Sequence, residues 1–360
     1  MMLAKLRKAK RYLVNTPLLY LYNRRQKRKP VKAKVIYLNI HKNYFKRYLY
    51  CFLKFFEIEG YTIYIGNDLD LFDELRREKY ADYLLTENIV RFGKPDKKII
   101  TLELDDSVIS ADYFGNIKGD INSTTSFYVP MTQHPLMYHA GYWNQPVKTQ
   151  ERKRSIFMSG NFDFDSYNQL EKDAVFEVMS RSAVYCYLIN EGLIYQIEDG
   201  TDLRIVLETS EDYKIVLINR LNFDIPAAEL RPLLCRFDFF FALPGVVMPF
   251  SHNIVEAMSV GAIPFIQEEY ASLFKPALTV SNAVMFKDKS DLIKKLNYLE
   301  TLSTGEVDEL RRNVYSYYNT YLTPHALVNA LEKIIYDKVY LQAEHYSVEL
   351  FKRYFQRPGI

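Results

Sequence analysis

The sequence has few cysteines, and their spacing excludes the sites that cysteines usually build. The 360 residues include three of them, Cys51, Cys186 and Cys235, with no CxxC pair. An odd number of widely separated cysteines argues against a disulfide framework and against a structural zinc site. We therefore expect buried free thiols and a reducing, cytoplasmic compartment.

Long apolar runs and several catalytic motifs are also missing. No stretch approaches the ~18 continuous apolar residues of a membrane span, and the N-terminus lacks the apolar core of a signal peptide. There is no GxxxxGK[ST] phosphate loop and no GxSxG elbow. These absences argue against a P-loop NTPase and an α/β-hydrolase.

Acidic residues are absent from the first part of the chain. Residues 1–56 contain 16 Lys and Arg but no Asp or Glu, whereas all 44 acidic residues and 31 of the 47 basic ones follow. Residues 1–30 are therefore predicted to be a basic leader, in which Pro17 should interrupt any single long helix. Such a segment suits an anionic membrane surface. A solvated tail is the first alternative, and nucleic-acid contact is the least favoured because the body of the chain is acidic.

The remaining sequence alternates between β-rich runs and helical periodicity, which predicts parallel βαβ units. The first series has strands at 34–40, 61–65, 83–86 and 98–104, with helices at 44–56 and 71–79. The second has strands at 154–159, 183–188, 213–218, 237–242 and 262–266, with helices at 167–180, 227–235 and 253–260. Helices close the chain from residue 289, the last at 324–346.

Residues 237–274 are the most informative stretch, with a strand, a Gly-containing loop, a helix, a short turn and a strand. The loop follows the carboxyl end of a parallel strand, where open α/β sheets bind ligands. Ser251 is a suitable N-cap, and the helix start offers N–H groups and a positive dipole end to a diphosphate. The Glu256 carboxylate, one turn later, can accept hydrogen bonds from ribose hydroxyls.

This pattern, with Glu256-Ala257 followed by Gly-Ala-Ile-Pro-Phe-Ile at 261–266, resembles exostosin-like glycosyltransferases. It resembles more loosely the fucosyltransferases that use a GDP-sugar. Weaker similarities at 128–142 and 154–161 extend the resemblance over residues 128–275. It implies a GT-B fold, with two Rossmann-like domains and a cleft between them. It also implies a donor nucleotide on this helix and inverting transfer with no metal held by the fold.

The resemblance also sets the expected domain boundaries. These are a basic leader (1–30), an acceptor domain (31–127), an interdomain segment (128–153), a nucleotide-sugar domain (154–322) and C-terminal helices that could cross back to the acceptor domain (323–360). Where the family often has a basic residue near the donor loop, this chain has Pro-Phe-Ser-His-Asn at 249–253. His252 or Arg236 could replace that basic residue as the phosphate partner.

The predicted site residues fall into three groups. An inverting transfer needs a general base near the acceptor hydroxyl. His41 is the first candidate because histidine exchanges protons near neutral pH; Glu87 and Asp105 occupy similar positions. His134 and His139 lack a third metal ligand and are expected to line the cleft or contact the acceptor. Donor binding is assigned to Gly160, Asn161, Arg236, Ser251, His252, Asn253 and Glu256.

No metal site or cofactor is expected. Asp68-Leu69-Asp70 superficially matches the DxD metal motif, but Asp68 is better placed to cap the helix that follows. The sequence therefore predicts an inverting, metal-independent glycosyltransferase that uses a nucleotide-sugar, which we expect to be UDP-linked. Its acceptor would be a hydroxyl of a glycan or glycolipid in surface polysaccharide synthesis.

Two alternatives and a location complete the prediction. The alternatives are a fucosyltransferase-like enzyme that uses a GDP-sugar, and a catalytically inactive glycan-binding subunit. The protein is expected to be cytoplasmic and peripheral on the inner face of a membrane, held to the anionic surface by residues 1–30. No nucleic-acid partner is expected.

Overall fold

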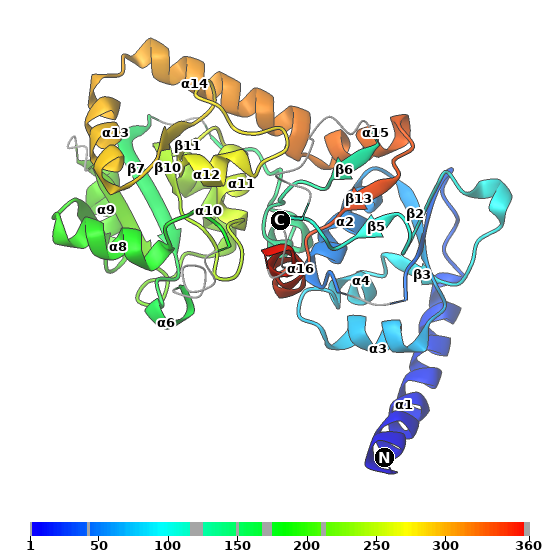
Figure 1. The fold of residues 1–360 in the computed structure, drawn as a ribbon. Coiled ribbons are helices and arrows are strands. Elements are labelled where there is room, and N and C mark those ends of the chain that lie inside the picture. The colour runs from blue at the N-terminus through cyan, green and yellow to red at the C-terminus, as the bar shows by residue number, and fades with distance from the viewer. Residues whose placement is uncertain are drawn as a thin grey trace. The chain divides into compact units, whose positions relative to one another are not determined.

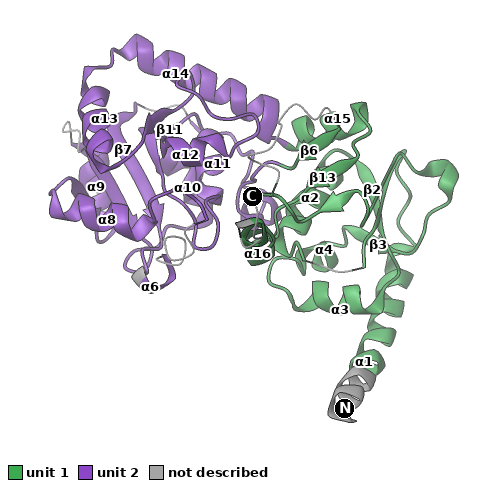
Figure 2. Cartoon of the chain, in the orientation of Figure 1, with its two compact units in different colours: residues 1–129, 324–360 green, residues 130–323 purple. Residues whose placement is uncertain are grey.

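The computed structural model describes residues 2–41, 44–115, 125–148, 151–167, 175–209 and 214–355, with side chains from Arg11 onward apart from Phe164 and Phe355. The chain forms two compact units (Figure 2). Unit 1 comprises Met1–Val129 and Pro324–Ile360, and unit 2 comprises Pro130–Thr323. The chain therefore enters unit 2 once and returns once.

Unit 1 is built on a parallel sheet with strand order β3-β2-β1-β4. Figure 1 labels two of these strands, β2 and β3. The two strands expected at 34–40 and 61–65 are confirmed, and Lys34 lies opposite Tyr61 in the register. The strands are β1 (Lys34–Asn39), β2 (Tyr61–Ile65), β3 (Val90–Phe92) and β4 (Leu102–Asp105).

The helices of unit 1 follow the predicted order. They are α2 (Arg47–Ile58), α3 (Leu69–Arg77), the short α4 (Tyr83–Thr86) and the 3-10 turn η1 (Lys97–Ile99). The helix α2 is largely buried, and its Lys54 ammonium donates to the Glu87 carboxylate at 2.8 Å. The positive charge of Lys54 is therefore paired. Asp68 caps α3, as expected, because its carboxylate accepts from the N–H groups of Asp70 and Leu71.

The strand expected at 83–86 is wrong. These residues form the helix α4, and the strand follows at 90–92. A short apolar run does not distinguish a strand from a buried helix by periodicity. Turns with positive φ at Tyr80 and Asn88 flank the segment and move the strand beyond it. The strand expected at 98–104 is shorter, because η1 occupies its first residues.

The C-terminal segment completes unit 1. Its strand β13 (Lys338–Tyr340) lies between β5 (Ile109–Ser110) and β6 (Ser126–Tyr128) in a three-stranded parallel sheet. The single helix expected at 324–346 is therefore wrong. It is divided into α15 (Pro324–Lys333), β13 and then α16 (His345–Phe355), because pairing with two strands overrides local helical periodicity.

The N-terminal segment forms one helix, α1 (Met2–Gln26), so the expectation that Pro17 interrupts it is wrong. Pro17 is exposed, and it has no backbone N–H to donate to the Leu13 carbonyl. Leu13 is itself 77% exposed. Water can therefore satisfy that carbonyl.

Unit 2 is built on a six-stranded parallel sheet with the order β12-β11-β10-β7-β9-β8. Every residue of β10 is buried, which fits its Phe-rich sequence. The strands are β7 (Lys153–Gly160), β8 (Ile194–Ile197), β9 (Ile215–Asn219), β10 (Phe237–Ala242), β11 (Ile263–Gln267) and β12 (Val284–Phe286).

The described helices of unit 2 precede, connect or follow these strands. They are α5 (Pro135–His139), α6 (Phe164–Tyr167), α8 (Arg181–Asn190), α9 (Gly200–Glu208), α10 (Ala227–Leu234), α11 (His252–Met258), α12 (Glu268–Ser272), α13 (Lys289–Thr301), α14 (Thr304–Tyr317) and the π-helical η2 (Tyr318–Leu322). Together the two units confirm the expected α/β class with two Rossmann-like parallel sheets.

The strand expected at 183–188 is wrong, since these residues lie inside α8. Ser180 caps this helix by accepting from the Ala183 N–H at 3.1 Å, a local signal that outweighs the β-rich composition. Cys186 is consequently exposed, whereas Cys51 and Cys235 are buried as expected. Of the helix expected at 167–180, residues 168–174 lie outside the described residues and 175–180 are not helical.

Candidate functional site

The topology of unit 2 locates a ligand crevice. From β7 the chain moves to β9 and β8 on one side, whereas β10, β11 and β12 lie on the other. The strand order therefore reverses between β7 and β10. In open parallel sheets, ligands bind outside the carboxyl ends of the strands at such a reversal. In this chain those ends are Gly160, which ends β7, and Ala242, which ends β10.

The end of β7 carries polar groups that point to a binding role. Ser159 is buried, and its Oγ makes no hydrogen bond within the described residues. Its carbonyl accepts from Asn253 Nδ2 at 3.0 Å, which ties the start of α11 to β7. The structure thus brings Gly160, Asn161 and Asn253, three of the predicted donor residues, to one edge of the sheet.

Arg181 is the main cation of this edge, and the sequence prediction missed it. It is the first residue of α8 and is 3% exposed. Its Nε donates to the Pro244 carbonyl at 3.2 Å, which lies beyond β10. Its Nη1 donates to the Asn161 carbonyl and to the Tyr167 hydroxyl, both at 3.0 Å. Arg181 therefore spans the two strand ends that define the crevice.

Among the residues that the structure describes, the hydrogen bonds of Arg181 all go to neutral groups. Within the described residues no carboxylate pairs with it, and Nη2 makes no hydrogen bond. Burial lowers the pKa of Arg181, and the neighbouring phenols of Tyr167 and Tyr270 offset this only in part. Arginine nevertheless remains charged in proteins. A buried cation without an anionic partner is costly, so this arrangement points to an anion that arrives with a ligand.

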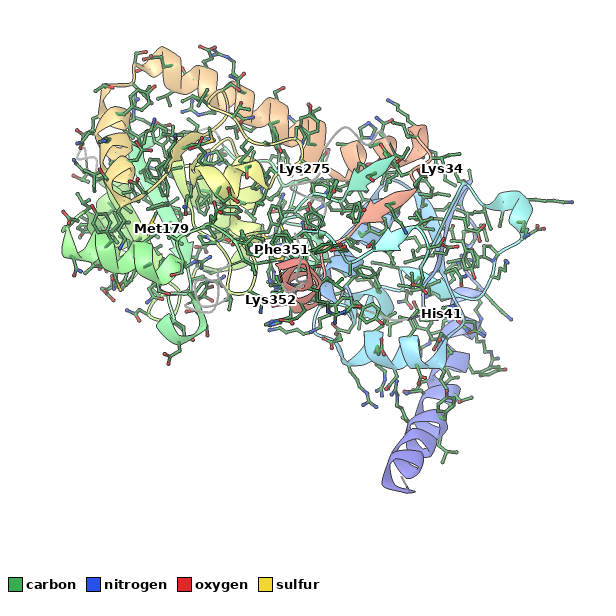
Figure 3. All side chains as sticks on the ribbon, viewed as in Figure 1. Lys34, His41, Met179, Lys275, Phe351 and Lys352 are labelled. Atoms are coloured by element: carbon green, nitrogen blue, oxygen red, sulfur yellow. The ribbon has the colours of Figure 1, made fainter. Side chains whose placement is uncertain are left out.

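Gly160 and Met179 fix the position of this guanidinium. A Cβ on Gly160 would lie 2.7 Å from Arg181 Nη1, so glycine is required for the approach. Met179, labelled in Figure 3, donates its N–H to Gln267 Oε1 at 2.8 Å, which holds the segment before α8 against β11. The glycine at the end of β7 and the bond of Met179 therefore both help to position Arg181.

The start of α11 is close to the prediction but differs in its bonds. Ser251 is the N-cap, yet its Oγ bonds the Asn253 side chain and not the helix backbone. Its N–H donates to the Tyr270 hydroxyl at 3.0 Å. Because α11 has seven residues, its dipole is short. The charge at this edge comes from Arg181, and not from the helix start on which the prediction relied.

Glu256 lies on the second turn of α11 and is 3% exposed. Its Oε1 accepts from the His134 N–H at 3.0 Å. Burial raises the pKa of the Glu256 carboxyl to about 6, although this hydrogen bond and the charges of Arg220 and Arg231 lower it. Within the described residues, the His134 N–H is the hydrogen-bond donor to the carboxylate.

His134, whose N–H bonds this carboxylate, also contacts His252. The Nδ1 of His252 is 2.9 Å from the Thr132 carbonyl, and the two imidazole rings are edge to face at 5.3 Å. His134 also caps α5, since its Nδ1 accepts from the Leu136 N–H at 3.2 Å. The structure therefore brings His134 together with the donor candidates, whereas His139 is exposed at the end of α5.

Buried polar side chains hold residues 130–145 against α10, α11 and η2. Arg231 donates to the carbonyls of Tyr142 and Gln145 at 3.0 and 2.7 Å. Gln133, which is fully buried, donates to the Trp143 carbonyl at 3.1 Å and to the Tyr318 hydroxyl at 2.9 Å. This segment, expected to lie between the domains, is thus an integral part of unit 2.

Arg236 is not at the crevice. It precedes β10, and its carbonyl accepts from Lys153 at the amino end of β7. Its Nη2 donates to the Leu207 carbonyl at 3.2 Å. Arg236 therefore lies at the opposite edge of the sheet from Gly160, and the structure does not bring it together with the other donor candidates. A cavity of about 310 Å³ between β12, α13 and α14 also lies toward that amino edge.

The three candidate bases lie in unit 1, in different settings. Glu87 accepts from the Tyr50 hydroxyl at 2.7 Å and from Lys54 at 2.8 Å, so its carboxylate is occupied. Asp105 caps its own turn through Ser107, and these bonds lower its pKa. His41, labelled in Figure 3, follows β1 with an exposed side chain whose Nδ1 is 3.9 Å from Asp68 Oδ2.

Neither a metal cluster nor a membrane-spanning helix was found in the described part of the chain. No group of three or more His, Cys, Asp or Glu side chains there could hold a metal ion. None of the helices described is both long and apolar enough to cross a bilayer.

No protein-family model matches the sequence, and no curated protein does. Solved structures are similar only weakly. A glycosyltransferase from Rickettsia africae aligns with a TM-score of 0.34 and 10% identity over 91% of this chain and 99% of that chain. HepE of Anabaena, in complex with UDP and glucose, aligns with a TM-score of 0.36 and 12% identity, over 84% of this chain and 100% of that chain. The N-terminal domain of Candida albicans trehalose-6-phosphate phosphatase aligns with a TM-score of 0.32 and 10% identity, over 87% of this chain and 73% of that chain. Likeness this low carries no conclusion about activity, which must come from the residues of this chain.

Proposed function

We propose that this chain is a glycosyltransferase that uses a nucleoside diphosphate sugar, and that the donor diphosphate binds beside Arg181. The observation that carries this proposal is the buried guanidinium at the reversal point of the unit 2 sheet, which has no carboxylate partner among the described residues. Guanidinium groups match phosphate oxygens in geometry and charge, and the Nη2 edge of Arg181 makes no hydrogen bond within the described residues.

The remaining donor contacts would come from the same edge of the sheet. The Ser159 hydroxyl and the backbone around Gly160 and Asn161 would contact the phosphates. The Glu256 carboxylate would accept a ribose hydroxyl through Oε2 while Oε1 keeps its bond to the His134 N–H. His252 would lie near the donor at the start of α11. This arrangement retains the exostosin-like resemblance as a proposal, with Arg181 in place of the basic residue absent from 249–253.

The proposed chemistry is a direct displacement with inversion. The acceptor hydroxyl oxygen forms a bond to the anomeric carbon while the bond to the phosphate oxygen breaks, and a base takes the hydroxyl proton. Arg181 would stabilise the charge that develops on the departing nucleoside diphosphate without a bound metal. His41 is the preferred base because Glu87 and Asp105 are engaged in hydrogen bonds within unit 1.

We further propose that the acceptor is a hydroxyl of a glycan or glycolipid in surface polysaccharide synthesis. The enzyme would work as a peripheral protein on the inner face of a membrane. Support comes from the strongly basic residues 1–56, since anionic lipid attracts Lys and Arg near its surface.

Thermal unfolding with UDP, GDP, CMP, dTDP and ADP tests the donor site. A nucleotide at about 100 times its Kd should raise stability by about 2.7 kcal/mol. We expect a response to UDP, which Arg181→Met should abolish while the variant stays folded. Release of the nucleoside diphosphate from the matching sugar donor then tests transfer, and the anomeric configuration of the product tests inversion.

The other outcomes are equally specific. A response to GDP alone would move the assignment to a fucosyltransferase-like donor. A folded protein that is silent to every nucleotide would contradict the enzyme proposal and favour a glycan-binding subunit. A nucleotide response that survives in Arg181→Met would remove Arg181 from the phosphate site.

A further inference from the structure

The helix α1 is held against unit 1 by one of its faces. Asn15, Leu19, Tyr22 and Gln26 recur at helical spacing and face α3 and β3. Tyr22 donates its hydroxyl to the Val90 carbonyl at 2.7 Å, and Gln26 donates to Asn88 Oδ1 at 3.1 Å. This face therefore makes specific contacts along the described part of the helix.

A buried carboxylate in α3 fixes the same face. Asp73 is 2% exposed and accepts from Asn15 Nδ2 at 2.6 Å. Arg11 Nε lies 2.5 Å from the other oxygen of Asp73. A buried charge requires such partners, so Asp73 determines which side of α1 turns toward the protein.

The opposite face of α1 exposes large apolar side chains. Leu13 is 77% exposed, Tyr20 67%, and Leu21 50%. At about 100° per residue these three lie within roughly 100° of one another and on the side opposite to Asn15 and Leu19. Such side chains in a row on a folded helix indicate an interaction surface.

A basic cluster continues this surface. Arg24, Arg25, Lys27, Arg28 and Lys29 are all exposed at the end of α1 and just beyond it. No acidic residue occurs among residues 1–56 to neutralise them. The exposed face of α1 thus combines apolar side chains with positive charge along one side.

We propose that Leu13, Tyr20 and Leu21, together with the basic residues of 24–29, form a preformed surface that docks on an anionic lipid bilayer. Helices with this combination lie in the membrane interface, where the apolar side chains reach the acyl boundary and basic groups meet anionic headgroups. Leucine side chains gain little from a nucleic-acid backbone, which is read chiefly by charge. Because the helix is already folded and held by Asp73, docking needs no disorder-to-order transition.

Flotation of the full-length protein with vesicles tests the proposal without any nucleotide, so its outcome is independent of the donor site. We expect binding to vesicles that contain phosphatidylglycerol, weak binding to pure phosphatidylcholine, and a decrease with salt. Each basic residue near anionic lipid contributes about a fivefold change in affinity. The charge variant is Arg24→Gln/Arg25→Gln/Lys27→Gln/Arg28→Gln, and the apolar variant is Leu13→Ser/Tyr20→Ser/Leu21→Ser.

The charge variant should lose at least about a hundredfold in vesicle affinity, and the apolar variant at least about tenfold. The matched control removes four exposed basic side chains from unit 2, Lys287→Gln/Lys289→Gln/Lys294→Gln/Arg312→Gln, and should retain binding. Circular dichroism would confirm that each variant is folded. Failure of the wild type to float, an equal loss in the control, or tighter binding to duplex DNA than to anionic vesicles would overturn the proposal.

Discussion

At the residue scale, Gly160 lets the Arg181 guanidinium reach the carboxyl edge of the unit 2 sheet, where we propose that the donor binds. The prediction at this scale is that Gly160→Ala displaces the guanidinium, because the new Cβ would lie 2.7 Å from Nη1. Overpacking of this kind should destabilise the fold by about 1–3 kcal/mol and weaken nucleotide binding. Gly200→Ala, with no atom within 4 Å of the added Cβ, is the control. It should leave binding unchanged and alter stability by at most about 1 kcal/mol. Urea unfolding and a UDP titration measure both effects.

Glu256 gives a prediction about pH. Its pKa rises from 4.5 to about 6 on folding, so the folded state holds this proton more tightly than the unfolded state. The contribution of Glu256 to stability should therefore be most favourable below pH 4.5, fall as the pH rises to about 6, and remain lower above it. The contribution is on the order of 2 kcal/mol. Glu256→Gln should be more stable than the wild type at pH 8, with the difference fading toward pH 4.5.

Urea unfolding of both proteins across this pH range measures the difference. The exposed substitution Glu191→Gln should change stability by less than about 0.5 kcal/mol at either end of the range. If Glu256→Gln is destabilising at every pH, the favourable interactions of the charged carboxylate outweigh the cost of burying its charge, and the prediction is wrong.

At the scale of elements, α3 depends on Asp73 for its attachment to α1. Asp73→Ala should destabilise unit 1 by about 2–3 kcal/mol, because Asn15 loses a charged hydrogen-bond acceptor and Arg11 loses a buried ion-pair partner. Asp70→Ala also removes a bond to Arg11, but the Asp70 side chain is 41% exposed. Its cost should stay under about 1 kcal/mol. Chemical unfolding measures the free energy of unfolding of both variants. An equal decrease in the two would show that the buried Asp73 contacts stabilise unit 1 no more than the exposed ion pair of Asp70 does.

The elements also show what a sequence can predict. The strands near 34–40 and 237–242 followed from unbroken β-rich runs between clear turns, and both are present. Residues 183–188 have the same composition but follow Ser180, whose capping bond begins α8. That capping bond is the signal that could have predicted Arg181 as the first residue of a helix. The ligand edge could thus be predicted from the strand–loop–helix pattern, whereas its cation could not, because it comes from a distant segment.

The same limit applied to Glu256 and Arg236. The position of Glu256 on α11 was predicted, but its bond to His134 depends on a segment 122 residues away in the chain. Arg236 was considered because it is basic and near β10 in sequence. Arg236 precedes β10 and therefore lies where the parallel strands begin, whereas the ligand crevice lies where they end.

At the scale of the whole molecule, the two units differ in how the chain builds them. Unit 2 is one continuous segment, 130–323, with its complete six-stranded sheet. Unit 1 needs both ends of the chain, because β13 lies between β5 and β6, and α15 packs on α2. Removing residues 324–360 would leave β5 and β6 without the strand that joins them.

We therefore predict that residues 130–323 expressed alone fold cooperatively and keep the UDP response, since Arg181, Gly160 and Glu256 all lie within that segment. Residues 1–129 alone should not give a cooperative transition. A fusion that joins 324–360 to 1–129 through a flexible linker should restore one. Circular dichroism and thermal unfolding measure folding, and a UDP titration measures the site. A fragment 130–323 that folds but does not respond to UDP, while the full chain does, would mean that unit 1 supplies part of the donor site.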